Sequence, residues 1–204
     1  YRIMSYRHFL ADDLQAMPKR QRTEFVQGLS GIKSLFAIIT SDGNTLNIAP
    51  FNSIVHISSN PARIGYISRP DNNHRHTLQN ITAHQSFSIN SVREEDLEEV
   101  VACSENLPSN HSEFEGKHIQ PTNPNNLTIP ALQCADVQIF CQYEEHITIP
   151  SSQGILVIGR IQEVIIREPL YQGEHQEAWK DLALSQGLEH FYIKGKYRKI
   201  TYRH

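Results

Sequence analysis

Closely spaced β-type segments are the feature that most constrains this fold. Between residues 33 and 92 the chain alternates apolar, β-branched runs with short turns, and two longer runs of the same kind follow at 132–143 and 155–168. Strands and helices do not alternate regularly, as they would in a parallel α/β sheet. The pattern therefore predicts a mainly β fold, an antiparallel barrel with peripheral α-helices.

Local signals in the sequence define the expected strands and their turns. Asp42-Gly43 is typical of a hairpin turn, because Asp-Gly accepts positive φ, and Asn60-Pro61 marks a second turn. The apolar phase of the last run flips near Gln162–Glu163, which predicts a bulge or a strong bend. The expected strands are 33–40, 45–49, 52–58, 62–68, 86–92, 132–143 and 155–168.

Helices are expected around this sheet, and one long region is irregular. Pro18 is suited to open a second helix within the first helical segment. A loop as long as 108–130 is usually functional or mobile. We predict a single domain over 1–204, with an N-terminal helical segment 11–30 and a C-terminal extension 170–204. The expected helices are 11–29, 77–84, 94–103 and 174–183.

Composition excludes several classes of protein. The 204 residues carry a net charge of −3, so bulk electrostatics gives no reason to expect a nucleic-acid partner. No apolar run approaches the roughly 18 residues that a membrane span needs, and no signal peptide is recognisable. The three cysteines include no CxxC pair, which favours a reducing compartment. We therefore expect a cytoplasmic protein without a membrane or nucleic-acid partner.

A cluster of cations follows the fourth expected strand and suggests a phosphate site. Arg69 ends the strand, where an arginine with a rigid base can bind phosphate oxygens in a bidentate manner. Thr77 stands where a helix N-cap is expected, with free backbone N–H groups beyond it. The cations between or beside them are His74, Arg75 and His76. One alternative is a solvated surface loop, and another is metal binding by His74 and His76, which the arginines disfavour.

The segment Asn47–Asn52, with the sequence NIAPFN, precedes this cluster by one hairpin. As a polar loop it would offer backbone groups to a flat heterocycle at the same end of the barrel. Alternatively, its two asparagines make turns and Pro50-Phe51 only packs. Combined with the cations, the segment suggests a phosphorylated aromatic cofactor.

Other catalytic signatures are absent. Neither the dinucleotide-binding glycine fingerprint nor the P-loop occurs, and the nucleophile-elbow and zinc-protease motifs are missing too. Glu113 and Glu115 are either acid/base groups or ordinary loop charges. His56 either faces a pocket or is a half-buried structural histidine.

Six sequence blocks in order resemble the flavin reductase-like family, which has the FMN-binding split-barrel fold. Together they span about residues 33–168. They read TSDGNTLNIAPFNSIVHISSNPARIGYISRP, RHTLQNI, FSIN, SEFE, LQCADVQIF and GILVIGRIQEV. The resemblance implies a split, Greek-key-like barrel and a homodimer with one FMN per subunit near the dimer interface.

The resemblance also implies the residues of a cofactor site. Those expected along the isoalloxazine and ribityl chain are Asn47, Ile48, Ala49, Pro50, Phe51 and Asn52. Those expected at the phosphate are Arg69, His76 and Thr77, with Ser68 nearby. The segment Ser112–Glu115 resembles one that approaches the flavin face. In the family pattern, a small hydroxyl residue usually stands at the position of Asn52.

The implied activity is that of an NAD(P)H:flavin reductase. FMN would accept hydride from NADH or NADPH and pass electrons to free flavin, oxygen, a metal chelate or a partner oxygenase. Many members carry a histidine associated with nicotinamide use where this chain has Gln153-Gly154-Ile155, and His146 is the nearest substitute. The alternatives are an FMN-binding electron carrier that serves a protein partner, and a split barrel that binds pyridoxal phosphate or haem.

Overall fold

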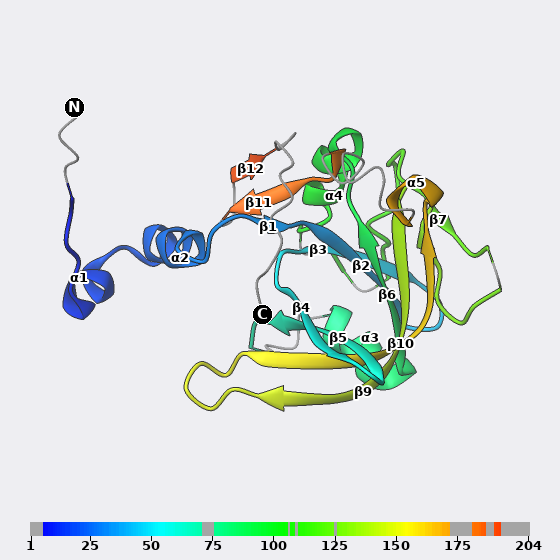
Figure 1. Cartoon of the computed structure of the whole chain (residues 1–204), viewed down its shortest axis with the longest axis horizontal. Coiled ribbons are helices and arrows are strands. Elements are labelled where there is room, and N and C mark those ends of the chain that lie inside the picture. The colour runs from blue at the N-terminus through cyan, green and yellow to red at the C-terminus, as the bar shows by residue number, and fades with distance from the viewer. Residues whose placement is uncertain are drawn as a thin grey trace, which may run out of the picture.

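A seven-stranded antiparallel sheet forms the centre of this computed structural model (Figure 1). The structure describes residues 6–70, 76–105, 107–108, 110–124, 126–171, 181–186 and 190–192. The strand order in the sheet is β3-β2-β6-β9-β10-β5-β4. The strands are β2 (Phe36–Ser41), β3 (Leu46–Phe51), β4 (Ile54–Ser59), β5 (Ala62–Ser68), β6 (Ser86–Ser91), β9 (Val137–Thr148) and β10 (Ile155–Ile166).

The two edge strands of this sheet, β3 and β4, are consecutive in the chain. Only Asn52 and Ser53 separate them, and three Cα–Cα steps cover at most about 11 Å, so the sheet must curl until its edges meet at this corner. Phe51, at the end of β3, contacts Tyr66 of β5 edge to face, with 4.8 Å between ring centroids. Because β3 and β4 are not paired, the barrel stays open on one side. The expected antiparallel split barrel is confirmed.

The expected turns and bulge are also present. The Asp42 carboxylate accepts hydrogen bonds from Asn44 N and Thr45 N at 2.8 and 2.7 Å, which closes the β2–β3 turn. The register of β10 against β9 shifts between Ile161 and Glu163, as the flipped phase predicts, and again beside Gly159. A Cβ at Gly159 would lie 2.5 Å from the Phe87 ring, so this bend requires glycine.

Apolar side chains fill both faces of the sheet. On β2, Ile38 belongs to one buried cluster, whereas Ala37 and Ile39 belong to the other, as the two-residue period of a strand requires. The cluster with Ile38 also holds Tyr66, Phe87, Val157 and residues of α3, and it fills the barrel. The second cluster packs against α4 and the following loops.

Several expected elements differ in detail. The first helical segment divides before Pro18 into α1 (Ala11–Ala16) and α2 (Lys19–Gly28), which extend from the barrel with no buried residue (Figure 1). The other helices are α3 (His76–His84), η1 (Glu94–Asp96), α4 (Leu97–Ala102) and α5 (Glu168–Tyr171). Most of the expected helix 174–183 lies outside the described residues, but Leu182 forms a β bridge to Arg93 instead. Over the ranges described, no helix has the length and apolar character of a membrane span.

Two small sheets correct the expected strand boundaries. The run 33–40 divides at Leu35, because Lys33–Ser34 (β1) leaves the main sheet to pair with β11 (Leu184–Gln186), which in turn pairs with β12 (His190–Tyr192). The run 132–143 also divides. Its start forms β8 (Ala131–Leu132), which pairs with β7 (Pro121–Thr122) inside the region expected to be irregular.

Candidate functional site

The segment NIAPFN is largely an edge strand. The expected strand 45–49 is confirmed and continues through Pro50 and Phe51, so the expectation of a loop is wrong for the first five residues of the segment. They belong to β3 and pair with β2 up to Phe36↔Phe51. Ile48 N and Leu46 O form hydrogen bonds on the side of β3 that faces away from β2. Every second residue of the strand, Pro50 included, therefore directs its backbone N and O to this outer side. The missing N–H of Pro50 therefore removes no ladder bond, which is the usual position of proline in a sheet.

A second segment, Ser112–Glu115, lies along the outer edge of β3. Ser112 Oγ donates a hydrogen bond to Leu46 O at 2.6 Å, and Glu113 Oε2 accepts one from Ile48 N at 3.1 Å. Cys103 Sγ, at the C-terminal end of α4, contacts Glu113 O at 3.8 Å. Glu113 is thus neither a free loop charge nor remote from the expected site. The resemblance of SEFE to a flavin-facing segment was the only signal for this contact in the sequence.

The start of α3 contacts β3 on the same part of the fold. Asn47 Nδ2 donates to Thr77 Oγ1 at 3.1 Å, and both side chains are buried. The described helix begins at His76, so Thr77 lies in its first turn and its hydroxyl serves Asn47, which corrects the expected N-cap role. A parallel bond from Asn80 Nδ2 to Thr40 Oγ1, at 3.2 Å, holds the next turn of α3 to β2.

Charged groups on α3 and just after the segment Ser112–Glu115 act on the carboxyl group of Glu113. Glu113 is 5% exposed, and burial raises the pKa of its carboxyl group. The hydrogen bond from Ile48 N and the positive charges of His76 and Lys117 act in the opposite direction and lower that pKa. An acid, an imidazole and a hydroxyl therefore gather at the edge of β3, which is suited to bind a polar ligand.

The remaining expected residues divide between this cluster and its surroundings. Ser68 is buried at the end of β5, where its Oγ donates to Arg69 O at 3.1 Å. Arg69 itself is exposed. Ala49 and Pro50 are half-buried on β3, and Phe51 packs on Tyr66. His74 and Arg75 lie outside the described residues.

Asn52 contacts a segment near the C-terminal end of the chain. Its Nδ2 donates to Ser185 Oγ of β11 at 3.0 Å, so the corner between β3 and β4 is attached to the C-terminal part of the chain. Ser185 is 2% exposed. No sequence signal indicated this contact, because 133 residues separate the two partners.

The histidines considered from the sequence lie elsewhere. His56 is exposed and its Nε2 contacts Ser59 Oγ at 3.2 Å, so it neither faces a pocket nor is half-buried. His146 is exposed on β9, where its Nδ1 lies 2.6 Å from Tyr143 Oη. The β9–β10 turn carries Gln153 with a φ of 58°.

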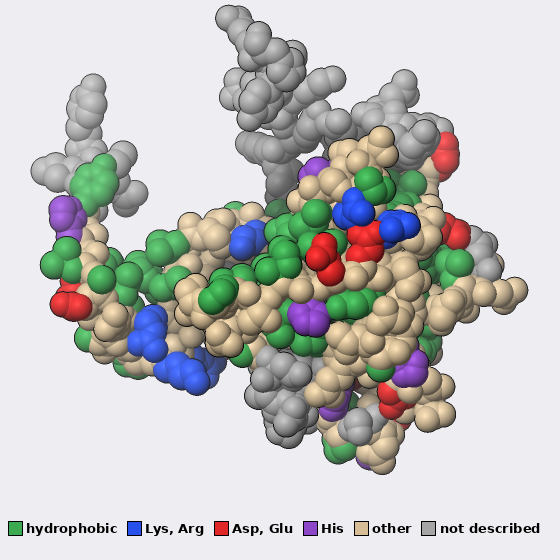
Figure 2. Space-filling view, turned by 90° about the horizontal axis from the view of Figure 1, so that it is seen from below, with side chains coloured by type: hydrophobic (Ala, Val, Ile, Leu, Met, Phe, Trp, Pro, Cys, Tyr) green, Lys and Arg blue, Asp and Glu red, His purple; other side chains and the backbone are tan. Residues whose placement is uncertain are grey.

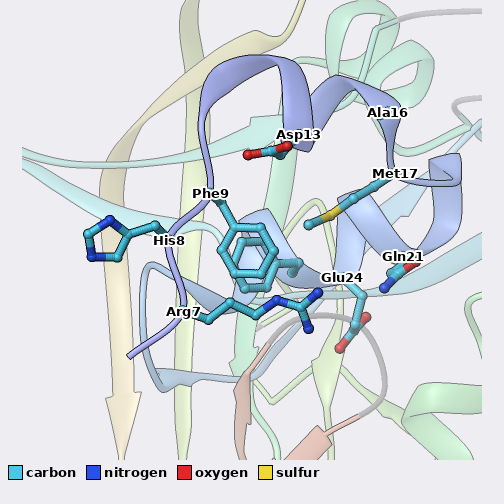
Figure 3. Close-up of a pocket in the computed structure, with 9 residues that line it drawn as sticks. Arg7, His8, Phe9, Asp13, Ala16, Met17, Gln21 and Glu24 are labelled. Atoms are coloured by element: carbon cyan, nitrogen blue, oxygen red, sulfur yellow. The ribbon is translucent and has the colours of Figure 1, made fainter. Parts of the chain in front are cut away.

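A cavity of about 650 Å³ lies apart from this cluster, between α2 and the residues before and within α1 (Figure 3). Phe9 packs against Phe25 there, with 5.0 Å between ring centroids. Exposed apolar side chains such as Leu10 and Val26 continue along the arm formed by α1 and α2 (Figure 2). None of the expected site residues lines this cavity.

Comparisons with known proteins identify the same fold. The family model described as "Flavin reductase like domain" matches residues 29–201. A crystal structure of a split-barrel protein from Shewanella frigidimarina NCIMB 400, assigned to the flavin reductases, superposes with a TM-score of 0.89 at 26% identity and covers 97% of this chain and 100% of that one.

Two further proteins extend the comparison. Nitrilotriacetate monooxygenase component B from Bacillus cereus has a TM-score of 0.82 at 19% identity, over 96% of this chain and 100% of that one, and shows the fold alone. The uncharacterized protein YwrF of Bacillus subtilis is 26% identical over 144 residues, which are 68% of this chain and 70% of that protein.

Proposed function

The chain belongs to the flavin reductase-like family, and we propose that it is an FMN-binding oxidoreductase that passes hydride from NADH or NADPH to flavin. The observation that carries this proposal is the 3.1 Å hydrogen bond between Asn47 and Thr77. It brings together the strand proposed to follow the isoalloxazine and the helix turn proposed to hold the phosphate.

The residues present fit a phosphorylated flavin. Arg69 is an exposed cation at the end of β5, and His76 begins α3, so both can contribute charge-assisted hydrogen bonds to a phosphate. The hydroxyl groups of Ser68 and Thr77 are donors of the type that phosphate accepts. The proposed wall beside the ring is formed by Asn47, Ile48, Ala49, Pro50, Phe51 and Asn52.

The chain needs no catalytic triad for this reaction. A bound flavin supplies the hydride acceptor, and the protein supplies binding, orientation and electrostatics. We assign no catalytic residue, because positioning the nicotinamide against the ring within about 3–3.5 Å accounts for the protein's part. The hydrogen bonds of Glu113 and Asn47 fix β3, the element that such positioning depends on.

We also propose that the protein is a homodimer, that residues 1–204 form a single domain and that the electrons pass to free flavin or a partner oxygenase. The last proposal draws support from the likeness to nitrilotriacetate monooxygenase component B, a component of a monooxygenase. We expect the protein to function in the cytoplasm.

The visible spectrum of the purified protein tests the cofactor. We expect two flavin absorption bands after reconstitution with FMN. The band at the longer wavelength should disappear when NADH or NADPH is added without oxygen. Parallel titrations with FMN and FAD distinguish the two flavins. Failure of either nicotinamide to reduce the bound flavin would refute the reductase function while leaving the flavin site in place.

A flavin-binding electron carrier is the second candidate. The observation that favours it is Gln153 in the β9–β10 turn, where the family pattern often has a histidine associated with nicotinamide use. Steady-state oxidation of NADH or NADPH with excess free flavin discriminates the two functions, because a carrier shows no turnover with either nucleotide.

A further inference from the structure

Glu113 satisfies one backbone N–H group at a large desolvation cost to its carboxylate. Its Oε2 accepts the hydrogen bond from Ile48 N, while the side chain is almost fully buried. Burying a carboxylate costs more free energy than burying a neutral acceptor of the same shape, such as glutamine. A neutral residue would also close the edge of β3, but with a weaker hydrogen bond to Ile48 N, which indicates that the charge of Glu113 has a use of its own.

The surroundings of Glu113 make its position well defined. Ser112 Oγ holds the preceding residue to Leu46 O at 2.6 Å, so the segment is bound to β3 at two points. Glu99 of α4 accepts hydrogen bonds from the N–H groups of His118 and Ile119, at 2.8 and 2.9 Å, and so fixes the chain shortly after this segment. A shift of Glu113 would therefore be transmitted to β3 rather than absorbed by a loose loop.

The titratable groups around Glu113 come from three elements. His76 lies at the start of α3, Lys117 follows shortly after the segment Ser112–Glu115, and the Cys103 thiol lies at the end of α4. An ionised carboxylate accepts a stronger hydrogen bond than a protonated carboxyl group does. Loss of the charge therefore loosens the bond to Ile48 N.

We propose that Glu113 is a positioning residue of the flavin site, which fixes the edge of β3 through Ile48 N and makes flavin affinity depend on its own protonation. This inference rests on the proposed function. It goes beyond that function by assigning the pH dependence of binding to one carboxylate that need not touch the flavin.

The test compares Glu113→Ala and Glu113→Gln with the wild type. Alanine removes the acceptor, whereas glutamine keeps an acceptor of the same length without the charge. FMN and riboflavin dissociation constants are measured by fluorescence titration between pH 4.5 and 7.5. Riboflavin lacks the phosphate, so its profile excludes titration of the phosphate and of groups that bind it. Glu98, exposed on α4, gives the control Glu98→Gln.

At pH 7 we expect Glu113→Ala to weaken FMN binding about 10-fold or more. Glu113→Gln keeps an acceptor without the charge, so it should weaken FMN binding less, by about threefold. Wild-type riboflavin affinity should fall as the pH is lowered through the raised pKa of Glu113. The Glu98→Gln control should show the same pH dependence of riboflavin affinity. The riboflavin affinity of Glu113→Gln should not change with pH. Amide hydrogen exchange of Ile48, measured by NMR without flavin, should accelerate in Glu113→Ala.

Three results overturn the inference. They are unchanged FMN affinity in folded Glu113→Ala, a glutamine variant as weak as the alanine variant, and a glutamine variant that keeps the wild-type pH profile. Absence of flavin binding by the wild type would instead refute the proposed function, and this inference with it. Unchanged exchange of Ile48 in Glu113→Ala would overturn the positioning role without reference to flavin.

Discussion

Replacing Thr77 by valine removes the acceptor of the Asn47 bond while keeping the shape of the side chain. Thr77 is 8% exposed and Asn47 9% exposed, so water cannot readily replace the lost partner of Asn47 Nδ2. A buried donor left without a partner costs about 1–3 kcal/mol of unfolding free energy. For a chain of this size, each kcal/mol lowers the melting temperature by about 2–4 °C.

The fold supplies a matched control for this change. Thr40 accepts a bond of nearly the same length, 3.2 Å, from Asn80, and this bond also joins α3 to the main sheet. Thr40 is fully buried. Thr40→Val should therefore also lower the melting temperature, although by no more than Thr77→Val does, because Asn80 is half-buried and its freed donor can reach water. Thr40 is no part of the proposed cofactor site.

Flavin affinity separates the two variants. If Thr77 contributes to the phosphate site, Thr77→Val should weaken FMN about 10- to 100-fold, the equivalent of one lost charge-assisted hydrogen bond. Thr40→Val should change the dissociation constant by less than about threefold. Differential scanning calorimetry and fluorescence titration measure the two effects. Equal losses of FMN affinity in both variants would refute the reasoning, because general destabilisation of α3 would then explain them.

Four further outcomes follow from the same structure. Gly159→Ala should destabilise the fold by about 1–3 kcal/mol in urea unfolding, because its Cβ meets Phe87, whereas Gly28→Ala should not destabilise it. Arg69→Ala should weaken FMN more than riboflavin, and equal losses would count against phosphate binding. Glu113 has a raised pKa, so the stability it confers is present below about pH 4.5 and lost as the pH rises through the raised value. Across that range, calorimetry should show the melting temperature of Glu113→Gln rising relative to that of the wild type. Native thiols should react slowly with Ellman's reagent at pH 8 and rapidly after unfolding, because burial raises the pKa of each of these thiols to about 12: Cys103, Cys134 and Cys141.

Local patterns were sufficient for most strands, turns and bends of the main sheet. Asp42-Gly43 closes the β2–β3 hairpin as predicted, and the flipped apolar phase near Gln162 corresponds to a register shift. These features depend on neighbours in the chain, so the sequence records them directly. Strand boundaries failed where a segment changes partners, as at Leu35, because the choice between two sheets depends on a strand near the C-terminus.

The candidate site shows the same division. The residues of β3 and the start of α3 were predicted, and the structure joins them through Asn47 and Thr77. The strand conformation of Pro50 and Phe51 and the bond from Asn52 to Ser185 were not predicted. Both follow from which element lies beside β3, which no local pattern encodes.

The sequence by itself determined the type of fold and the chemical character of the site, because periodicity, turn residues and charged side chains act over a few residues. Only the tertiary structure decided that a carboxylate 65 residues away from Ile48 closes the edge of β3. An edge strand offers its outward N–H and C=O groups to any segment that can reach them. The packing of α4 and Ser112–Glu115 selects Glu113 for that position.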